Sequence, residues 1–132
     1  MPMTRISLRR GLGADYRARL SALLQRALEE HFAVPPRDCF QLFDEYTAGN
    51  RVVDPHYPYG DTAARSGDFL LLQITAGRRR SRAQKCALYS ALATACRQQL
   101  GLDPADLMVV ITCNDVDDWS FSSGRCYGGE TQ

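Results

Sequence analysis

The chain has 132 residues, with 16 basic and 15 acidic side chains and a formal net charge of +1 at pH 7. This length fits one domain with a hydrophobic core, and the balanced charge argues against nucleic-acid or membrane partners. The start lacks a signal-peptide core and no apolar run is long enough to span a membrane, so we expect a cytoplasmic protein. Five cysteines without a C-x-x-C pair suggest neither a zinc site nor a disulfide framework.

The first part of the chain predicts a strand, a helix and a second strand. Residues 2–8 alternate between apolar and polar or charged side chains, which is typical of a half-buried strand. Residues 14–32 place leucines, alanine and phenylalanine on one helical face and charged residues on the other. Pro35 and Pro36 end this helix, and residues 39–46 are interpreted as the second strand.

Residues 47–67 contain glycines, prolines and tyrosines without sustained periodicity, and we interpret them as a long connection. One short strand is expected within it, at residues 51–54. A connection of this length is uncommon in a compact domain and is often functional or interfacial.

The same pattern then returns. Residues 69–75 form an apolar run that predicts a strand. Ser81 and Gln84 have the spacing of a capping box, which predicts a helix from there to about residue 100. Residues 107–113 predict a final strand, and residues 114–132 form a C-terminal tail.

The two halves correspond in detail, because residues 33–40 and 101–108 both run from a helix end through a proline and an aspartate into a strand. We therefore predict one α/β (α+β) domain over residues 1–132, made of β-α-β units at about 2–46 and 68–113. Strands joined through a helix run parallel, so the sheet should have four mostly parallel strands with both helices on one face. The bare face predicts a symmetric oligomer.

Pro2 is the first candidate for chemistry. If Met1 is removed, Pro2 carries a secondary amine at the start of a strand, which can act as a base, an acid or a nucleophile. If Met1 stays, the Pro2 nitrogen is an amide with no proton and no basicity. The alternative is that the proline is simply the second residue, since proline is common there.

Arginines 78–80 lie between the end of a predicted strand and the start of a helix. This edge of an α/β sheet is where ligands bind, and a helix amino terminus favours anions. Residues two apart in an extended segment point the same way, so Arg78 and Arg80 can converge on one carboxylate while Arg79 faces elsewhere. The alternatives are a solvated charged turn and a nucleic-acid patch, which the balanced total charge disfavours.

Three further residues allow two interpretations. Asp38 has a counterpart in Asp106, so both aspartates could simply cap the turn before a strand instead of one being catalytic. Trp119 and Phe121 could pack on the sheet, or they could wall off a pocket and lower its dielectric constant.

Together these segments resemble the tautomerase superfamily and, within it, the malonate semialdehyde decarboxylase group. The resemblance covers nearly the whole chain and is carried by MPMTRISLRRG, VPPRDCFQ, LLQITAGRRRSRAQKCALY and DWSF. It implies a cofactor-independent, metal-free homotrimer with a catalytic amino-terminal proline. By motif, it implies catalytic roles for Pro2, Asp38, Arg78 and Arg80, substrate binding by the two arginines, and a hydrophobic wall of Trp119 and Phe121.

The sequence departs from this pattern at two places. Residues 122–124 read Ser-Ser-Gly where the family usually has G-x-G, and Ala83 replaces a frequent acidic residue, which bears on the lid and the substrate range. Glu29 lies nearest to the helix histidine of the related dehalogenase branch, so dehalogenation is a weaker expectation.

The resemblance predicts an enzyme for small 2- or 3-oxo acids, whose carboxylate is held by Arg78, Arg80 or both. A cationic Pro2, stabilised by Asp38, would polarise the substrate carbonyl while carbon dioxide leaves, or Pro2 would form a covalent iminium. A neutral Pro2 would act as a base in keto–enol tautomerisation. Two alternatives stay open: a phenylpyruvate-type tautomerase or hydratase without decarboxylase activity, and a non-catalytic trimeric binder of small anions.

Overall fold

Strand β1 (Pro2–Arg9) follows from the alternation at the start of the chain. In the computed structural model, which describes residues 1–60 and 64–128, every second side chain of β1 is buried, namely Pro2, Thr4, Ile6 and Leu8. The side chains between them are half-buried or exposed. The predicted first strand is therefore confirmed.

Helix α1 (Gly13–Phe32) buries one stripe of residues against the sheet, consisting of Leu20, Leu23, Leu24, Ala27, Leu28 and Phe32. It ends at Ala33, which adopts a left-handed conformation with φ of 55°. Strand β2 (Gln41–Tyr46) begins two residues later than the sequence predicts. The reason is a tight turn before it, in which the Asp38 N–H donates to the Pro35 carbonyl at 3.0 Å.

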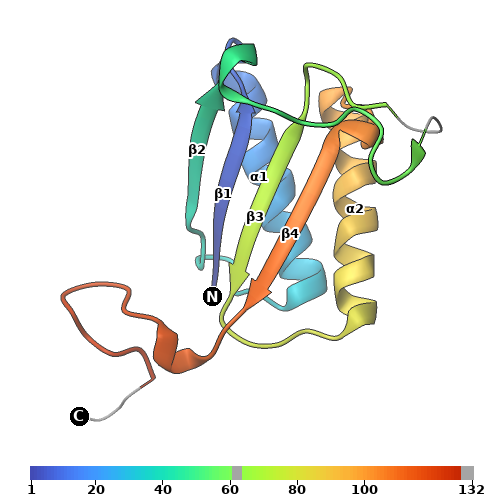
Figure 1. Ribbon diagram of the computed structural model, residues 1–132. Coiled ribbons are helices and arrows are strands. Elements are labelled where there is room, and N and C mark those ends of the chain that lie inside the picture. Colours follow the sequence, from blue (N-terminus) through green and yellow to red (C-terminus); the bar gives the residue numbers. More distant parts are fainter. Residues whose placement is uncertain (61–63, 129–132) are drawn as a thin grey trace.

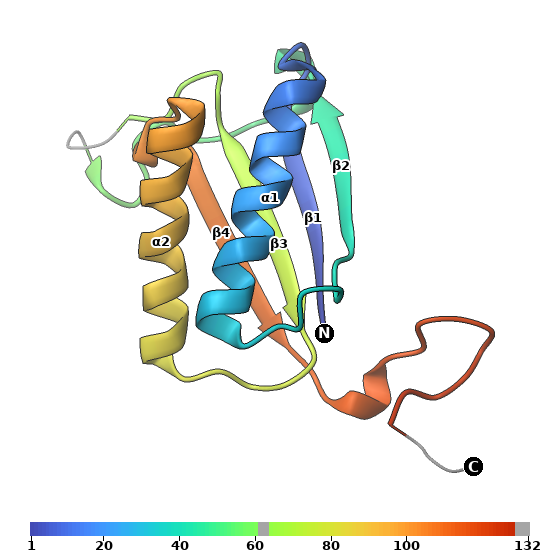
Figure 2. The same ribbon diagram turned by 180° about the vertical axis from the view of Figure 1, so that it is seen from behind.

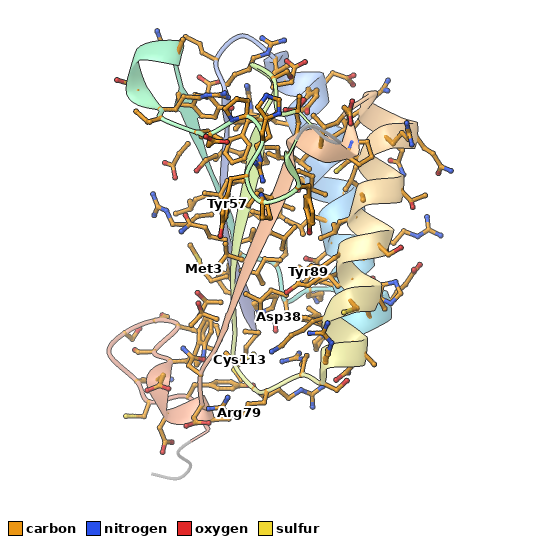
Figure 3. All side chains as sticks on the ribbon, turned by 45° about the vertical axis from the view of Figure 1, so that its right-hand side comes forward. Met3, Asp38, Tyr57, Arg79, Tyr89 and Cys113 are labelled. Carbon is orange, nitrogen blue, oxygen red and sulfur yellow. The ribbon has the colours of Figure 1, made fainter. Side chains whose placement is uncertain are left out.

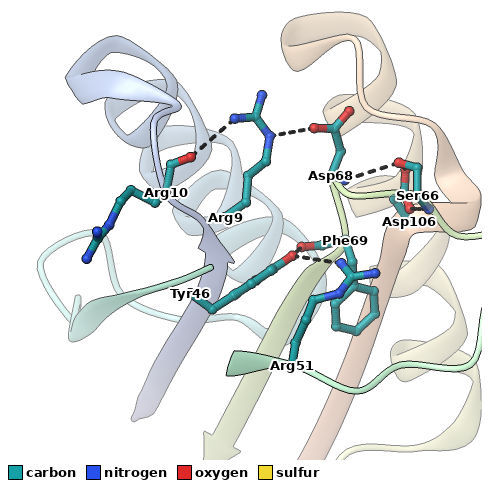
Figure 4. A network of polar contacts seen from close by, with 8 residues as sticks. All are labelled: Arg9, Arg10, Tyr46, Arg51, Ser66, Asp68, Phe69 and Asp106. Atoms are coloured by element: carbon teal, nitrogen blue, oxygen red, sulfur yellow. Dashed lines mark hydrogen bonds and ion pairs between the residues drawn. The ribbon is translucent and has the colours of Figure 1, made fainter. Parts of the chain in front are cut away.

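The connection after β2 holds no strand at residues 51–54, so that prediction is wrong. The segment begins with a short 3-10 helix (Ala48–Asn50) and is then held by side chains instead of a strand ladder. The Arg51 guanidinium lies 5.6 Å from the ring centres of both Tyr46 and Phe69 (Figure 4). Val52 is fully exposed, so the segment has no apolar face to bury as a strand. Residues 61–63 of the predicted connection lie outside the described residues.

The second unit agrees closely with the prediction. Strand β3 (Leu70–Ala76) is followed by helix α2 (Arg82–Leu100), and strand β4 (Leu107–Cys113) has the predicted bounds. The capping box is present, with the Gln84 N–H donating to Ser81 Oγ at 3.1 Å and the Ser81 N–H donating to Gln84 Oε1 at 2.9 Å.

The four strands lie in the order β2-β1-β3-β4. The outer pairs β1–β2 and β3–β4 are parallel, whereas the central pair β1–β3 is antiparallel, with Pro2 opposite Ala76. The predicted fold class is confirmed, because two β-α-β units form one mostly parallel sheet with both helices on the same face (Figures 1 and 2). Because β1 and β3 are antiparallel, the start of β1 and the end of β3 lie at the same end of the sheet.

The hydrophobic core lies between the sheet and the two helices and includes Ile6, Leu72 and Ile74 from the strands and Leu24 and Leu88 from the helices. The opposite face of the sheet has no layer over it among the described residues (Figure 1). Within the same described part of the chain, neither helix is long and apolar enough to cross a membrane.

Candidate active site

The predicted site residues meet at one end of the sheet. β1 begins there, β3 and β4 end there, and the turn before β2 lies beside the amino terminus (Figure 1). Asp38, Arg79 and Cys113 all lie towards this end in Figure 3, whereas Tyr57 lies towards the other. Segments that are distant in sequence therefore form one candidate site.

The amino terminus lies against Asp38. The Met1 ammonium donates to the Asp38 carboxylate, and the two side chains are only 14% and 18% exposed. Gln25 of helix α1 supports this arrangement, because its Nε2 donates to the Asp38 carbonyl at 3.2 Å. The carboxylate thus faces the chain terminus at the start of β1.

Asp106, the counterpart of Asp38, is used differently. It is 2% exposed and accepts hydrogen bonds from the Ser66 N–H at 2.5 Å and the Ser66 Oγ at 2.6 Å. It lies at the opposite end of the sheet, where it holds the end of the long connection (Figure 4). The correspondence between the two sequence segments therefore does not extend to the function of their aspartates.

Arg80 points inwards. Its guanidinium donates to the Phe32 carbonyl at 2.8 Å and to the Arg78 carbonyl at 2.7 Å, and it lies 4.8 Å from the centre of the Phe32 ring. The side chain is 9% exposed. Burial, with a contribution from the nearby charge of Arg78, lowers the Arg80 pKa from its ordinary value. Arg80 thus caps the carboxyl end of α1 and braces the backbone at Arg78.

Arg78 has an exposed side chain, unlike Arg80. Its guanidinium makes no hydrogen bond or ion pair with any residue of the described ranges 1–60 and 64–128. The two arginines are two positions apart, yet they do not present their guanidinium groups alike. Of these two arginines, only Arg78 has a guanidinium that is exposed and unpaired among the described residues.

The tail returns to the site through aromatic contacts. The rings of Trp119 and Phe121 stack with centres 5.3 Å apart, and Phe121 also stacks on Phe40 at 5.4 Å. Trp119 Nε1 donates to Asn114 Oδ1 at 2.6 Å, which fixes its orientation. Tyr127 adds an edge contact to Phe121 at 4.9 Å. Phe40 lies two residues after Asp38, and its carbonyl accepts a hydrogen bond from the Thr4 N–H at 2.9 Å, so this aromatic cluster contacts the segment that connects Asp38 to β2.

Sequence reasoning missed several residues of this region, namely Gln25, Phe40, Gly77 and Tyr127. The position of Gly77 between a strand and the arginine run could have signalled close backbone contact. Gln25 interrupts the apolar stripe of α1 with a polar side chain, which is a weak signal because many helices carry glutamine. Phe40 and Tyr127 follow no pattern that would have identified them.

The described residues contain no group of three or more histidine, cysteine, aspartate or glutamate side chains that could hold a metal ion. The groups that lie at this end of the sheet are the chain terminus, a carboxylate, an exposed guanidinium and aromatic rings. These groups can bind an anionic substrate, transfer a proton and exclude water.

This fold is that of a tautomerase, and the chain belongs to the tautomerase enzyme family, whose model matches residues 38–122. Probable tautomerase YusQ of Bacillus subtilis (strain 168) is 30% identical over 125 residues, which cover 95% of this chain and 96% of that protein.

Solved structures with this fold include a malonate semialdehyde decarboxylase that is 28% identical, with a TM-score of 0.85 and coverage of 94% of this chain and 93% of that chain. A symmetric trimer of fused 4-OT is 22% identical, with a TM-score of 0.75 and coverage of 94% of both chains. The second likeness shows the fold alone.

Proposed function

We propose that this chain is an amino-terminal-proline enzyme that acts on small 2- or 3-oxo acids, with decarboxylation of malonate semialdehyde-like substrates as its main reaction. The observation that carries the proposal is the ion pair between the chain terminus and Asp38, at the end of the sheet where Arg78 is exposed. The likeness to malonate semialdehyde decarboxylase supports the choice of reaction.

Removal of Met1 is the step that activates the site. The Met1 and Pro2 nitrogens are three bonds apart, which places the Pro2 nitrogen within roughly 4 Å of the atom that now contacts Asp38. Once freed, the Pro2 amine is a cation close to the Asp38 carboxylate, and an adjacent carboxylate favours the protonated form of an amine. Pro2 then serves as a general acid.

The two arginines have different roles: Arg78 binds the substrate directly, whereas Arg80 positions Arg78. Arg78 holds the substrate carboxylate, because its guanidinium is exposed and without a partner among the described residues. Arg80 keeps the backbone of Arg78 in place through its hydrogen bond to the Arg78 carbonyl. Loss of Arg80 would therefore disturb the site through Arg78.

The reaction follows from this placement. The bond between the carboxylate carbon and the adjacent carbon breaks, and its electron pair moves towards the carbonyl, whose oxygen receives a proton from Pro2. Carbon dioxide leaves, and the resulting enol takes a proton from water at carbon while its hydroxyl proton returns to Pro2, which gives the aldehyde and restores the cationic amine. The aromatic cluster around Phe121 lowers the local dielectric constant and strengthens these interactions.

A homotrimer is part of the proposal. The sheet face opposite the helices carries exposed apolar side chains, including Leu42 at 51%, Met108 at 43% and Val110 at 41% exposure. Burial of such a face between subunits is favourable. The trimeric assembly of the fused 4-OT protein supports three copies as the arrangement.

The test is proton NMR of malonate semialdehyde incubated with enzyme whose loss of Met1 has been confirmed by mass. We expect acetaldehyde from the wild type and at least about a 10²-fold lower rate from Asp38→Asn, in which the acid is no longer supported. Arg78→Ala should raise KM strongly. Arg79→Ala is the matched control, because it removes an equally exposed neighbouring charge. Equal activity in all variants would contradict the assignment.

Keto–enol tautomerisation is the second candidate, because YusQ is named a probable tautomerase. In that case the wild type would give no acetaldehyde but would ketonise enol-phenylpyruvate, with a neutral Pro2 acting as base. If the processed protein catalyses neither reaction, the proposal fails, and a hydratase or a small-anion binder is the remaining alternative.

A further inference from the structure

Met1 occupies the candidate site much as a substrate bonded to the Pro2 nitrogen would. Its carbonyl carbon is bonded to the Pro2 nitrogen, and its carbonyl oxygen accepts a hydrogen bond from the Gly77 N–H at 2.8 Å. Its side chain lies against Gly77, where an added Cβ would be 2.7 Å from Met1 Cβ. Because Met1 is 14% exposed, most of the space that it fills is enclosed.

Removal of Met1 leaves the Gly77 N–H without its acceptor. Gly77 is buried and continues the ladder between β1 and β3, in which Ala76 is opposite Pro2. A buried backbone N–H without a partner is unfavourable, and native structures rarely leave one unpaired. The processed site therefore contains a fixed donor beside the Pro2 amine.

We propose that in the processed enzyme the Gly77 N–H binds the carbonyl oxygen of the substrate, and that the space held by Met1 is the substrate's binding place. The inference rests on the proposed function. The Met1 carbonyl group, which adjoins the Pro2 nitrogen and accepts from the Gly77 N–H, marks the region in which the substrate carbonyl lies when Pro2 polarises it. Negative charge develops on that oxygen as carbon dioxide leaves, which a fixed donor stabilises.

The same geometry defines the class of substrate. The Met1 side chain is unbranched and runs over Gly77, so the space suits a short acyclic oxo acid. Gly77 does not have a positive φ, so its backbone conformation does not require glycine. The requirement is for space, since any side chain at residue 77 would occupy the place of the substrate.

The first test is Gly77→Ala in enzyme whose loss of Met1 has been confirmed by mass. We expect KM for malonate semialdehyde to rise about tenfold or more, since displacing a substrate by an ångström can cost about 10²-fold in rate. Gly49→Ala is the matched control, because an added Cβ there meets nothing within 4 Å. An unchanged KM in folded Gly77→Ala would overturn the proposal.

The second test follows the Gly77 amide by NMR hydrogen exchange in three samples. The amide should be protected when Met1 is retained by inhibiting its removal, unprotected in the processed enzyme, and protected again when malonate is added. Malonate that inhibits the enzyme without changing the exchange of this amide would overturn the inference. An inactive wild type would defeat the proposed function, whereas an active wild type with an unresponsive Gly77 would defeat only this inference.

Discussion

Replacement of Asp106 should destabilise the fold and leave the chemistry intact. Asp106 is 2% exposed and accepts two hydrogen bonds from Ser66, at 2.5 and 2.6 Å. In Asp106→Ala both are lost, and the long connection is released from the start of β4. The candidate active end of the sheet is not involved, because Asp38 and Pro2 lie at its opposite end (Figure 3).

The magnitude follows from these contacts. A hydrogen bond to a charged group contributes about 1.5–3 kcal/mol, and the two donors of Ser66 regain water because Ser66 is exposed. We therefore expect a loss of about 2–4 kcal/mol for Asp106→Ala and about 1–2 kcal/mol for Asp106→Asn, which keeps one acceptor oxygen. Ser66→Ala removes only the Oγ donor and should cost about 1 kcal/mol.

The assay is urea unfolding followed by circular dichroism at one fixed protein concentration, because oligomer stability depends on concentration. With slopes of about 1–3 kcal/mol per molar urea, a loss of about 2–4 kcal/mol in Asp106→Ala should lower the midpoint by roughly 0.7–4 M. The reasoning is refuted if Asp106→Ala costs less than about 1 kcal/mol. It is refuted equally if the folded variant loses activity as Asp38→Asn does.

Three further predictions concern the capping box, a buried thiol and a buried phenol. Ser81→Ala should destabilise the protein by about 0.5–2 kcal/mol in the same urea assay, and an unchanged midpoint would contradict the role of the cap. Burial raises the pKa of the Cys96 thiol to about 11, so a disulfide reagent at neutral pH should label exposed Cys39 quickly and Cys96 only after unfolding. Burial also raises the pKa of Tyr16 to about 12. The folded protein then keeps a proton that the unfolded chain loses, so stability should fall between pH of about 10 and about 12, and Tyr16→Phe should flatten this fall.

Most of the fold could be predicted, because apolar residues recur along each strand and helix with the spacing that places them on its buried face. β4 matches its prediction at both ends, and α2 begins at the capping box formed by Ser81 and Gln84. Strand order could not be predicted, because alternation in β1 and β3 shows which side chains are buried but not which strand pairs with which. Residues 51–54 are a second example. Valine favours strands, but Val52 is fully exposed and residues 51–54 pair with no strand.

The sequence predicted which residues lie near the candidate site better than it predicted how their side chains are oriented. Arg78 and Arg80 were expected to converge, on the premise that the segment is extended and both side chains point outwards. The structure turns Arg80 towards the Phe32 carbonyl at the end of α1, a contact over 48 positions that no local pattern encodes. Asp38 and Asp106 have similar sequence surroundings, and only the antiparallel centre of the sheet separates their environments.

That antiparallel centre relates the two β-α-β units by an approximate half-turn, so each end of the sheet is a counterpart of the other. One end begins with the chain terminus, which processing can turn into a free amine. At the other end β3 is preceded by Phe69, whose nitrogen is locked in a peptide bond, and Arg9 pairs with Asp68 at 2.7 Å. The two ends of the sheet are therefore structural counterparts, but only the end at Pro2 can present an amino-terminal amine.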